Sequence, residues 1–327
     1  MLSRTADHLY WMSRYTERAE NTARMLDVNY QMSLLPQSTQ TIENAWRAML
    51  EISELTEHYA SRHESVTPAG VIQFMVSDVD NLSSIVRCLQ AARENARAVR
   101  GAITTELWET INTTWLDAQR MMREGIMQRS PSDFFEWVKF RSHLTRGVHN
   151  GTMMRDEVYD FIQIGTFLER ADNTARLLDV KFLAAAASKN ERLDTVDEFY
   201  YWAAILRSVS AFENYRKVYR DIITPERIAE LLILNLNMPR SLAACLQEVV
   251  ETLTRIRNNH SRGTQLAALS LFSTLRDQTI EEILEIGVHE YLTDFLTQIN
   301  DVGLGISKDF LVPLDIAAED TTTIAQK

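Results

Sequence analysis

Residues 17–28 of the chain read "ERAENTARMLDV", and residues 169–180 read "ERADNTARLLDV". On a helical wheel, each copy places apolar side chains on one side and polar side chains on the other, the 3.6-residue period of an amphipathic helix. The pattern predicts one long helix over about 3–33 and a second over about 155–188. Folding requires that apolar positions recur, but it gives little reason for the same charged residues to recur.

The similarity between the two segments extends along the chain. At an offset of 152, residues 15–30 match residues 167–182 at ten of sixteen positions. At an offset of 156, Trp46-x-Ala48-x-Leu50 aligns with Trp202-x-Ala204-x-Leu206, and at 157 Cys88 aligns with Cys245. We therefore predict a tandem duplication, with repeat one over about 1–150 and repeat two over about 151–313. Two copies are too few for a solenoid, so a pseudo-symmetric helical bundle is expected.

The composition is that of a helical protein. Only 10 of 327 residues are glycine and 6 are proline, and no stretch alternates apolar and polar residues as a half-buried strand does. We predict an all-α bundle of about ten to twelve helices, forming a single domain over 1–313 with a flexible tail over 314–327. Cap-then-proline patterns predict helix starts at Pro68, Pro131, Pro225 and Pro239.

Several classes of function are disfavoured by composition and motifs. The net charge of −11 argues against nucleic acid or an anionic membrane as the main partner. No run of about 18 apolar residues predicts a membrane span, and no glycine-rich phosphate loop is present. We expect no cofactor and no metal centre, since the seven histidines are scattered singly. Two distant cysteines, expected in the core, and a charged N-terminal segment predict a cytoplasmic protein.

The repeated polar residues are the candidate binding site. They are Glu17, Arg18, Asn21 and Arg24, with their counterparts Glu169, Arg170, Asn173 and Arg176. One interpretation is a buried network, in which a glutamate of one repeat pairs with an arginine of the other and fixes their register. The other is a pocket, in which arginines bind a carboxylate or phosphate and a glutamate holds an amine. The glutamates are also weak candidates for a catalytic acid and base, which would require a raised carboxylate pKa.

The segments "YWMSRYTERAENTARMLDV" (10–28) and "MMRDEVYDFIQIGTFLERADNTARLLDV" (153–180) resemble the alpha-E domain family, bacterial all-helical proteins named for a Glu-Arg motif. The resemblance covers about residues 1–313, and the motif maps onto Glu17-Arg18 and Glu169-Arg170. This chain departs from the family pattern at Tyr159, where a Trp is expected, and at Thr166, where an Arg is expected.

Members of this family occur beside circularly permuted ATP-grasp ligases. The resemblance therefore implies a role in peptide or amide-bond synthesis or modification, with an ATP-grasp ligase as partner. Our first hypothesis is a helical component without an ATP site, which docks the ligase or binds its amino-acid or peptide intermediate. The second is a structural scaffold or homo-oligomer in which the Glu-Arg clusters lock the repeats together. The third is an enzyme that uses Glu17 and Glu169.

Overall fold

The computed structural model describes residues 1–36, 38–187 and 195–311, and the predicted tail over 314–327 lies outside them. All regular structure in the described ranges is helical, which confirms the all-α prediction. The helices are α1 (Ser3–Ser33), α2 (Thr39–Ile52), α3 (Thr56–Ala60), α4 (Pro68–Ser77), α5 (Ile85–Ala98), α6 (Thr105–Arg123), α7 (Ile126–Arg129), α8 (Pro131–Thr152), α9 (Glu157–Ala187), α10 (Thr195–Ser208), α11 (Phe212–Tyr219), α12 (Pro225–Ala229), a π-helical turn (Glu230–Leu234), α13 (Leu242–Arg255), α14 (Arg262–Asp277), α15 (Ile280–Ile286) and α16 (Val288–Phe310).

The sixteen α-helices in the described ranges exceed the predicted ten to twelve. Four of them, α3, α7, α12 and α15, have only four to seven residues. A helix this short spans two turns or fewer and cannot display a repeating apolar stripe, so periodicity does not reveal it.

Proline marks helix starts well, with one exception. Pro68, Pro131 and Pro225 are the first residues of α4, α8 and α12, as predicted. The start predicted at Pro239 is wrong, because α13 begins at Leu242. The hydroxyl of Ser241 accepts a hydrogen bond from the backbone N–H of Ala244 at 3.0 Å, so this serine is the N-cap and the proline lies in the preceding loop.

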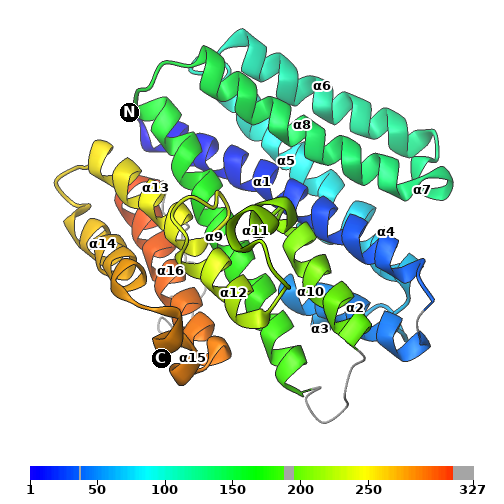
Figure 1. The fold of residues 1–327 in the computed structure, drawn as a ribbon. Coiled ribbons are helices and arrows are strands. Elements are labelled where there is room, and N and C mark those ends of the chain that lie inside the picture. Colours follow the sequence, from blue (N-terminus) through cyan, green and yellow to red (C-terminus); the bar gives the residue numbers. More distant parts are fainter. Residues whose placement is uncertain (37, 188–194, 312–327) are drawn as a thin grey trace, which may run out of the picture.

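Two helices of 31 residues, α1 and α9, pack against each other at the centre of the molecule (Figure 1). Helices α5 and α8 pack on α1, with α6 outside them, while α13 and α16 pack on α9, with α14 outside them. The shorter helices cross over, since α2 contacts α9 and α10 contacts α1. Each long helix is therefore covered by elements from both halves of the chain.

The apolar core surrounds this central pair. Leu9, Leu26, Ile164 and Leu178 are fully buried, and they come from α1 and α9 alike. Cys88 and Cys245 are also fully buried and free, as predicted, and burial raises the pKa of each thiol to about 12. Among the described residues, no helix combines the length and the apolar character needed to cross a membrane.

Candidate functional site

The two long helices approach closely where both carry a small residue. A Cβ atom on Gly165 of α9 would lie 2.2 Å from Ser13 Oγ and 2.5 Å from the carbonyl oxygen of Tyr10, both on α1. Glycine is therefore required at this contact, because any side chain would collide with the facing helix. Glu17 and Glu169 each lie four residues after this contact, so one helical turn brings both carboxylates beside it.

The Glu-Arg dipeptides of the two helices pair crosswise. The carboxylate of Glu17 accepts from Arg170 Nε at 2.9 Å and from its Nη2 at 3.0 Å. The carboxylate of Glu169 accepts from Arg18 Nε at 2.5 Å and from its Nη2 at 3.0 Å. Both pairs are bidentate, the geometry that gives an arginine–carboxylate bond both strength and direction.

Each of these carboxylates also pairs with at least one further arginine. Arg14 Nε donates to Glu169 at 2.7 Å from one turn earlier on α1. Glu17 accepts from Arg146 of α8 at 2.9 Å and from Arg240, in the loop before α13, at 3.0 Å. The arginine expected at Thr166 is absent, and the hydroxyl of Thr166 donates to a backbone carbonyl of its own helix at 2.9 Å instead. Glu17 is paired with Arg146 and Arg240 in addition to Arg170.

Glu20 forms the second centre of the network. Its carboxylate accepts from Arg24 at 2.5 Å, from Arg240 at 2.6 Å and from Arg146 at 2.5 Å. The hydroxyl of Ser142 adds a fourth hydrogen bond at 2.7 Å. Asn21 joins through its side-chain oxygen, which accepts from Arg240 at 2.7 Å. Four of the eight predicted residues therefore come together with Glu20 and the arginines from other elements, and these four are Glu17, Asn21, Arg24 and Arg170.

The remaining predicted residues are Arg18 of α1 and Glu169, Asn173 and Arg176 of α9. Arg18 and Glu169 form their own cluster with Arg14. Arg176 donates to Asp172 at 2.9 Å and pairs with Glu54 of the α2–α3 turn, away from the crossed pairs. Asn173 is half-buried, and no hydrogen bond joins its side chain to any residue within the described ranges. The predicted residues thus divide between a cluster around Glu17 and Glu20 and a second cluster around Glu169, with Asn173 and Arg176 outside both.

Five residues of the network were missed from the sequence, and they are Arg14, Glu20, Ser142, Arg146 and Arg240. Glu20 and Arg14 lie on the polar side of the same helix as the motif, so the helical wheel contained the signal. Arg146 and Arg240 come from α8 and from the loop before α13, and only the folded chain brings them to Glu17.

The electrostatics favour ionised carboxylates. Glu17, Glu20 and Glu169 are 1%, 0% and 4% exposed. Burial raises the pKa of Glu169, but the charges of Arg14 and Arg18 outweigh it and hold the pKa at about 2. The pKa values of Glu17 and Glu20 are also lowered, since their arginines outweigh burial. A carboxyl group that serves as a general acid near neutral pH needs the opposite shift.

The space around the carboxylates is small. A void of about 20 Å³ touches Glu17, Arg146, His149 and Thr166, which is room for a single water molecule. His149 Nε2 is buried without a partner among the described residues, and burial lowers the pKa of this imidazole to about 4. No group of three or more His, Cys, Asp or Glu side chains that suits a metal ion occurs in the described part of the chain.

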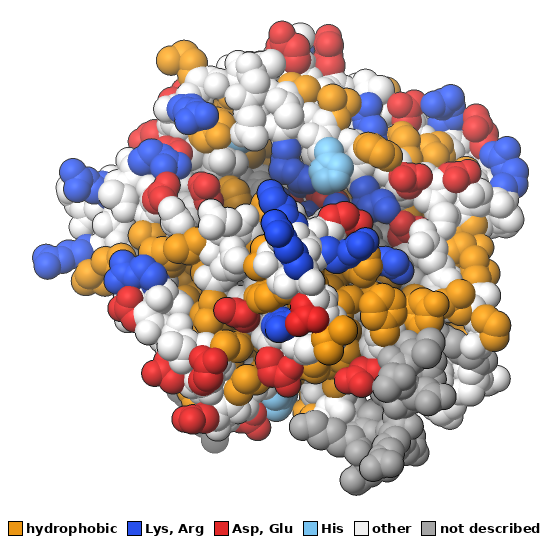
Figure 2. All heavy atoms as spheres, in the orientation of Figure 1, with side chains coloured by type: hydrophobic (Ala, Val, Ile, Leu, Met, Phe, Trp, Pro, Cys, Tyr) orange, Lys and Arg blue, Asp and Glu red, His pale blue; other side chains and the backbone are white. Residues whose placement is uncertain are grey.

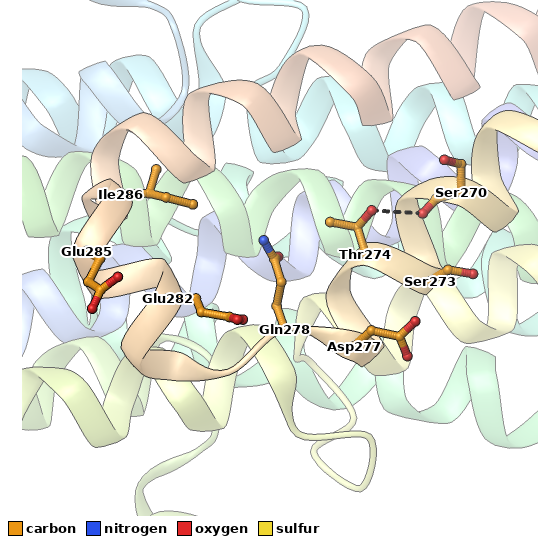
Figure 3. A pocket seen from close by; sticks show the side chains of 8 residues that line it. All are labelled: Ser270, Ser273, Thr274, Asp277, Gln278, Glu282, Glu285 and Ile286. Carbon is orange, nitrogen blue, oxygen red and sulfur yellow. Dashed lines mark hydrogen bonds between the residues drawn. The ribbon is translucent and has the colours of Figure 1, made fainter.

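A larger cavity lies away from the network, between the end of α14 and the helix α15 (Figure 3). Its volume is about 690 Å³, and hydroxyl and carboxylate side chains line it, with Gln278 and Glu282 near its middle. It is open to solvent and includes none of the residues of the Glu-Arg network.

Comparison with known proteins agrees with the central place of the Glu-Arg pairs. A family model named Alpha-E, described as a predicted alpha-helical domain with a conserved ER motif, matches residues 1–311. No curated protein and no solved structure matches the chain. Because the match covers almost the whole described chain and the crossed Glu-Arg pairs lie at its centre, the chain belongs to the Alpha-E family.

Proposed function

We propose that this protein is a helical component, without an ATP site of its own, of an ATP-grasp-associated system for peptide or amide-bond synthesis or modification. Its role is to dock the ligase. The resemblance to a family whose members occur beside ATP-grasp ligases supports the partner. The location that follows is the cytoplasm, where ATP is available, and the two free cysteines are compatible with it.

The observation that favours docking over catalysis is that the Glu-Arg network is closed. Both glutamates of the repeated motif are buried and engaged by two or more arginines. A substrate would have to displace these bonds to reach the carboxylates, whose lowered pKa values disfavour acid catalysis. The acid–base hypothesis for Glu17 and Glu169 therefore has the least support, and docking is favoured over chemistry at the carboxylates.

We further propose that the two halves are tandem copies of one helical unit. The crossed pairing of the two Glu-Arg dipeptides and the close contact of Ser13 with Gly165, its counterpart at an offset of 152, support this. The exchange of short helices, α2 onto α9 and α10 onto α1, is the arrangement that a pseudo-two-fold axis would produce.

The test of the proposed function is co-purification of the full chain with the ATP-grasp protein encoded beside it, followed by ligase assays with and without this chain. We expect a stable complex and a change in the rate or length of the product. Absence of both association and any change in product would refute the proposal. The Glu17→Gln/Glu169→Gln double variant separates the roles of the network, since loss of folding indicates a lock and loss of activity in a stable fold indicates a site.

A second candidate is a scaffold that forms homo-oligomers. The same closed network favours it, because a lock between α1 and α9 needs no ligand. Light scattering after size-exclusion chromatography at several concentrations tests it. A stable oligomer that neither binds the ligase nor alters its products would favour the scaffold over the docking component.

A further inference from the structure

Positive charge is in surplus on the Glu17–Glu20 side of the network. The carboxylates of Glu17 and Glu20 are bonded by four guanidinium groups, those of Arg24, Arg146, Arg170 and Arg240. On the other side, three arginines meet three carboxylates, and these are Arg14, Arg18 and Arg176 with Glu169, Asp172 and Glu54. Two positive charges on the first side thus have no carboxylate of their own. A buried charge without a counter-charge is costly.

One position accounts for part of this difference. The offset of 156 that aligns Trp46 with Trp202 also aligns Glu54 with Ser210. Both residues adopt the left-handed region, with φ of 55° and 52°, at the turn that follows a helix of the same length. Glu54 gives Arg176 a carboxylate, whereas Ser210 gives the corresponding Arg24 only a hydroxyl, at 2.5 Å. We call the surroundings of Arg24 the first arm and those of Arg176 the second arm. The first arm therefore lacks a carboxylate that the second arm has.

Donors at this arm are left without acceptors. Arg24 is 7% exposed, and no acceptor among the described residues meets its Nε. The side-chain Nδ2 of Asn21, three residues earlier on the same helix, is buried without a partner as well. Buried donors of this kind are rare, and each calls for an acceptor that the chain itself does not provide. Burial and the neighbouring charges of Arg170 and Arg24 also lower the pKa of Arg240, despite its two carboxylate partners.

The arm is accessible from solvent. Ser210 and His143 are exposed, and a quarter of the Arg146 side chain remains exposed. Arg146 Nη2 donates to His143 Nδ1 at 2.6 Å, which places the proton of the neutral imidazole on Nε2, so that His143 is a further donor. Figure 2 shows Lys and Arg side chains, with one His, gathered around a recess at the centre of the face that Figure 1 presents.

The adjacent segment adds to this positive field. Residues 207–220 carry four exposed cationic side chains and one acid, Glu213, in a protein whose net charge is −11. The four are Arg207, Arg216, Lys217 and Arg220. None of them forms an ion pair within the described residues. A local excess of this sign attracts anions and raises their concentration near Ser210 and its partner Arg24.

We propose that the cluster in which Arg24 bonds to Ser210, Arg146 bonds to His143 and both arginines bond to Glu20 binds one carboxylate or phosphate group of an anionic ligand. The group occupies the place that the Glu54 carboxylate fills at the other arm, and it accepts from the guanidinium of Arg24 and from the outer donors of Arg146 and His143. The site goes beyond the docking role and can be measured on the isolated full chain.

The test is isothermal titration calorimetry of the full chain at constant ionic strength, with inorganic phosphate and acetate as separate probes and chloride as the background ion. We expect saturable binding of at least one probe with one site per chain. Binding of phosphate alone indicates a phosphoryl ligand, binding of acetate alone indicates a carboxylate ligand, and binding of both indicates shared recognition.

The decisive variant is Ser210→Glu, which supplies the missing carboxylate from within the chain. It should weaken probe binding by about tenfold or more and raise the thermal unfolding temperature of the unliganded protein. Val218→Glu is the matched control, because it adds the same charge to an exposed position of α11. Saturable binding of neither probe, equal weakening by the two variants, or a lower unfolding temperature for Ser210→Glu would overturn the proposal.

Discussion

Replacement of Glu17 by Gln removes one buried charge from the centre of the molecule and keeps the shape of the side chain. The wild-type carboxylate satisfies Arg170 with two hydrogen bonds and Arg240 and Arg146 with one each. In the variant, the four arginines of this side would share Glu20 as their one remaining carboxylate. The neutral amide would also turn an N–H donor toward guanidinium donors, where an acceptor is required.

The expected cost follows from the burial of these groups. Glu17 is 1% exposed and Arg170 is 7% exposed, so solvent cannot replace the lost partner. Removal of one partner of a buried ion pair typically lowers the free energy of unfolding by about 3–5 kcal/mol. A typical domain has only about 5–15 kcal/mol in total, so the variant should be close to the limit of folding at 37 °C.

Urea unfolding followed by far-UV circular dichroism measures this cost, with Glu54→Gln as the control. Glu54 also pairs with an arginine, but 69% of its side chain is exposed, and a surface pair contributes about 0–1 kcal/mol. We expect a large decrease in the urea midpoint for Glu17→Gln and little change for Glu54→Gln. If Glu17→Gln lowers the free energy of unfolding by less than about 1 kcal/mol, the view that the crossed pairs hold α1 against α9 is refuted.

Three further predictions concern pH, packing and thiol chemistry. Because the pKa of Glu169 is about 2 in the folded protein and about 4.5 in the unfolded chain, its ionised form stabilises the fold above pH 4.5. That stability should be lost as the pH falls from about 4.5 to 2, and urea midpoints measured across this range should fall less steeply in Glu169→Gln. Gly165→Ala should lower the free energy of unfolding by about 1–3 kcal/mol through its collision with α1, whereas Gly147→Ala, which meets no atom within 4 Å, should raise it by about 0.5–1 kcal/mol. With thiol pKa values of about 12, Cys88 and Cys245 should react with iodoacetamide at pH 8 only after denaturation, as mass spectrometry would show.

Much of the fold was predictable because its longest elements are strongly periodic. The first long helix was predicted over about 3–33 and is observed at Ser3–Ser33, and the second was predicted over about 155–188 and is observed at Glu157–Ala187. The helix count and the start of α13 were not predictable from periodicity. Short helices show no repeating stripe, and a serine cap two residues after Pro239 decides where α13 begins.

The candidate site was predictable only in part. Identical polar letters in two distant segments placed Glu17 and Arg170 in one cluster, and the crossed pairing agrees with the buried-network interpretation. Arg146 and Arg240 could not be found this way, since neither belongs to the repeated string and each is more than 120 residues from Glu17 along the chain. The asymmetry between Glu54 and Ser210 lies in a turn whose contacts with α9 and α1 arise only on folding.

The crossed pairs also affect how the chain is made. Glu17 and its partner Arg170 are 153 residues apart. At a translation rate of roughly 5–20 residues per second, roughly 8–30 s pass between the synthesis of the first partner and that of the second. During this interval α5 and α8 can pack on α1, because both precede α9 in the chain, but the face of α1 that α9 covers remains open. We therefore expect chaperones to bind the ribosome-bound first half at this face, and slower translation before residue 157 to lengthen its exposure.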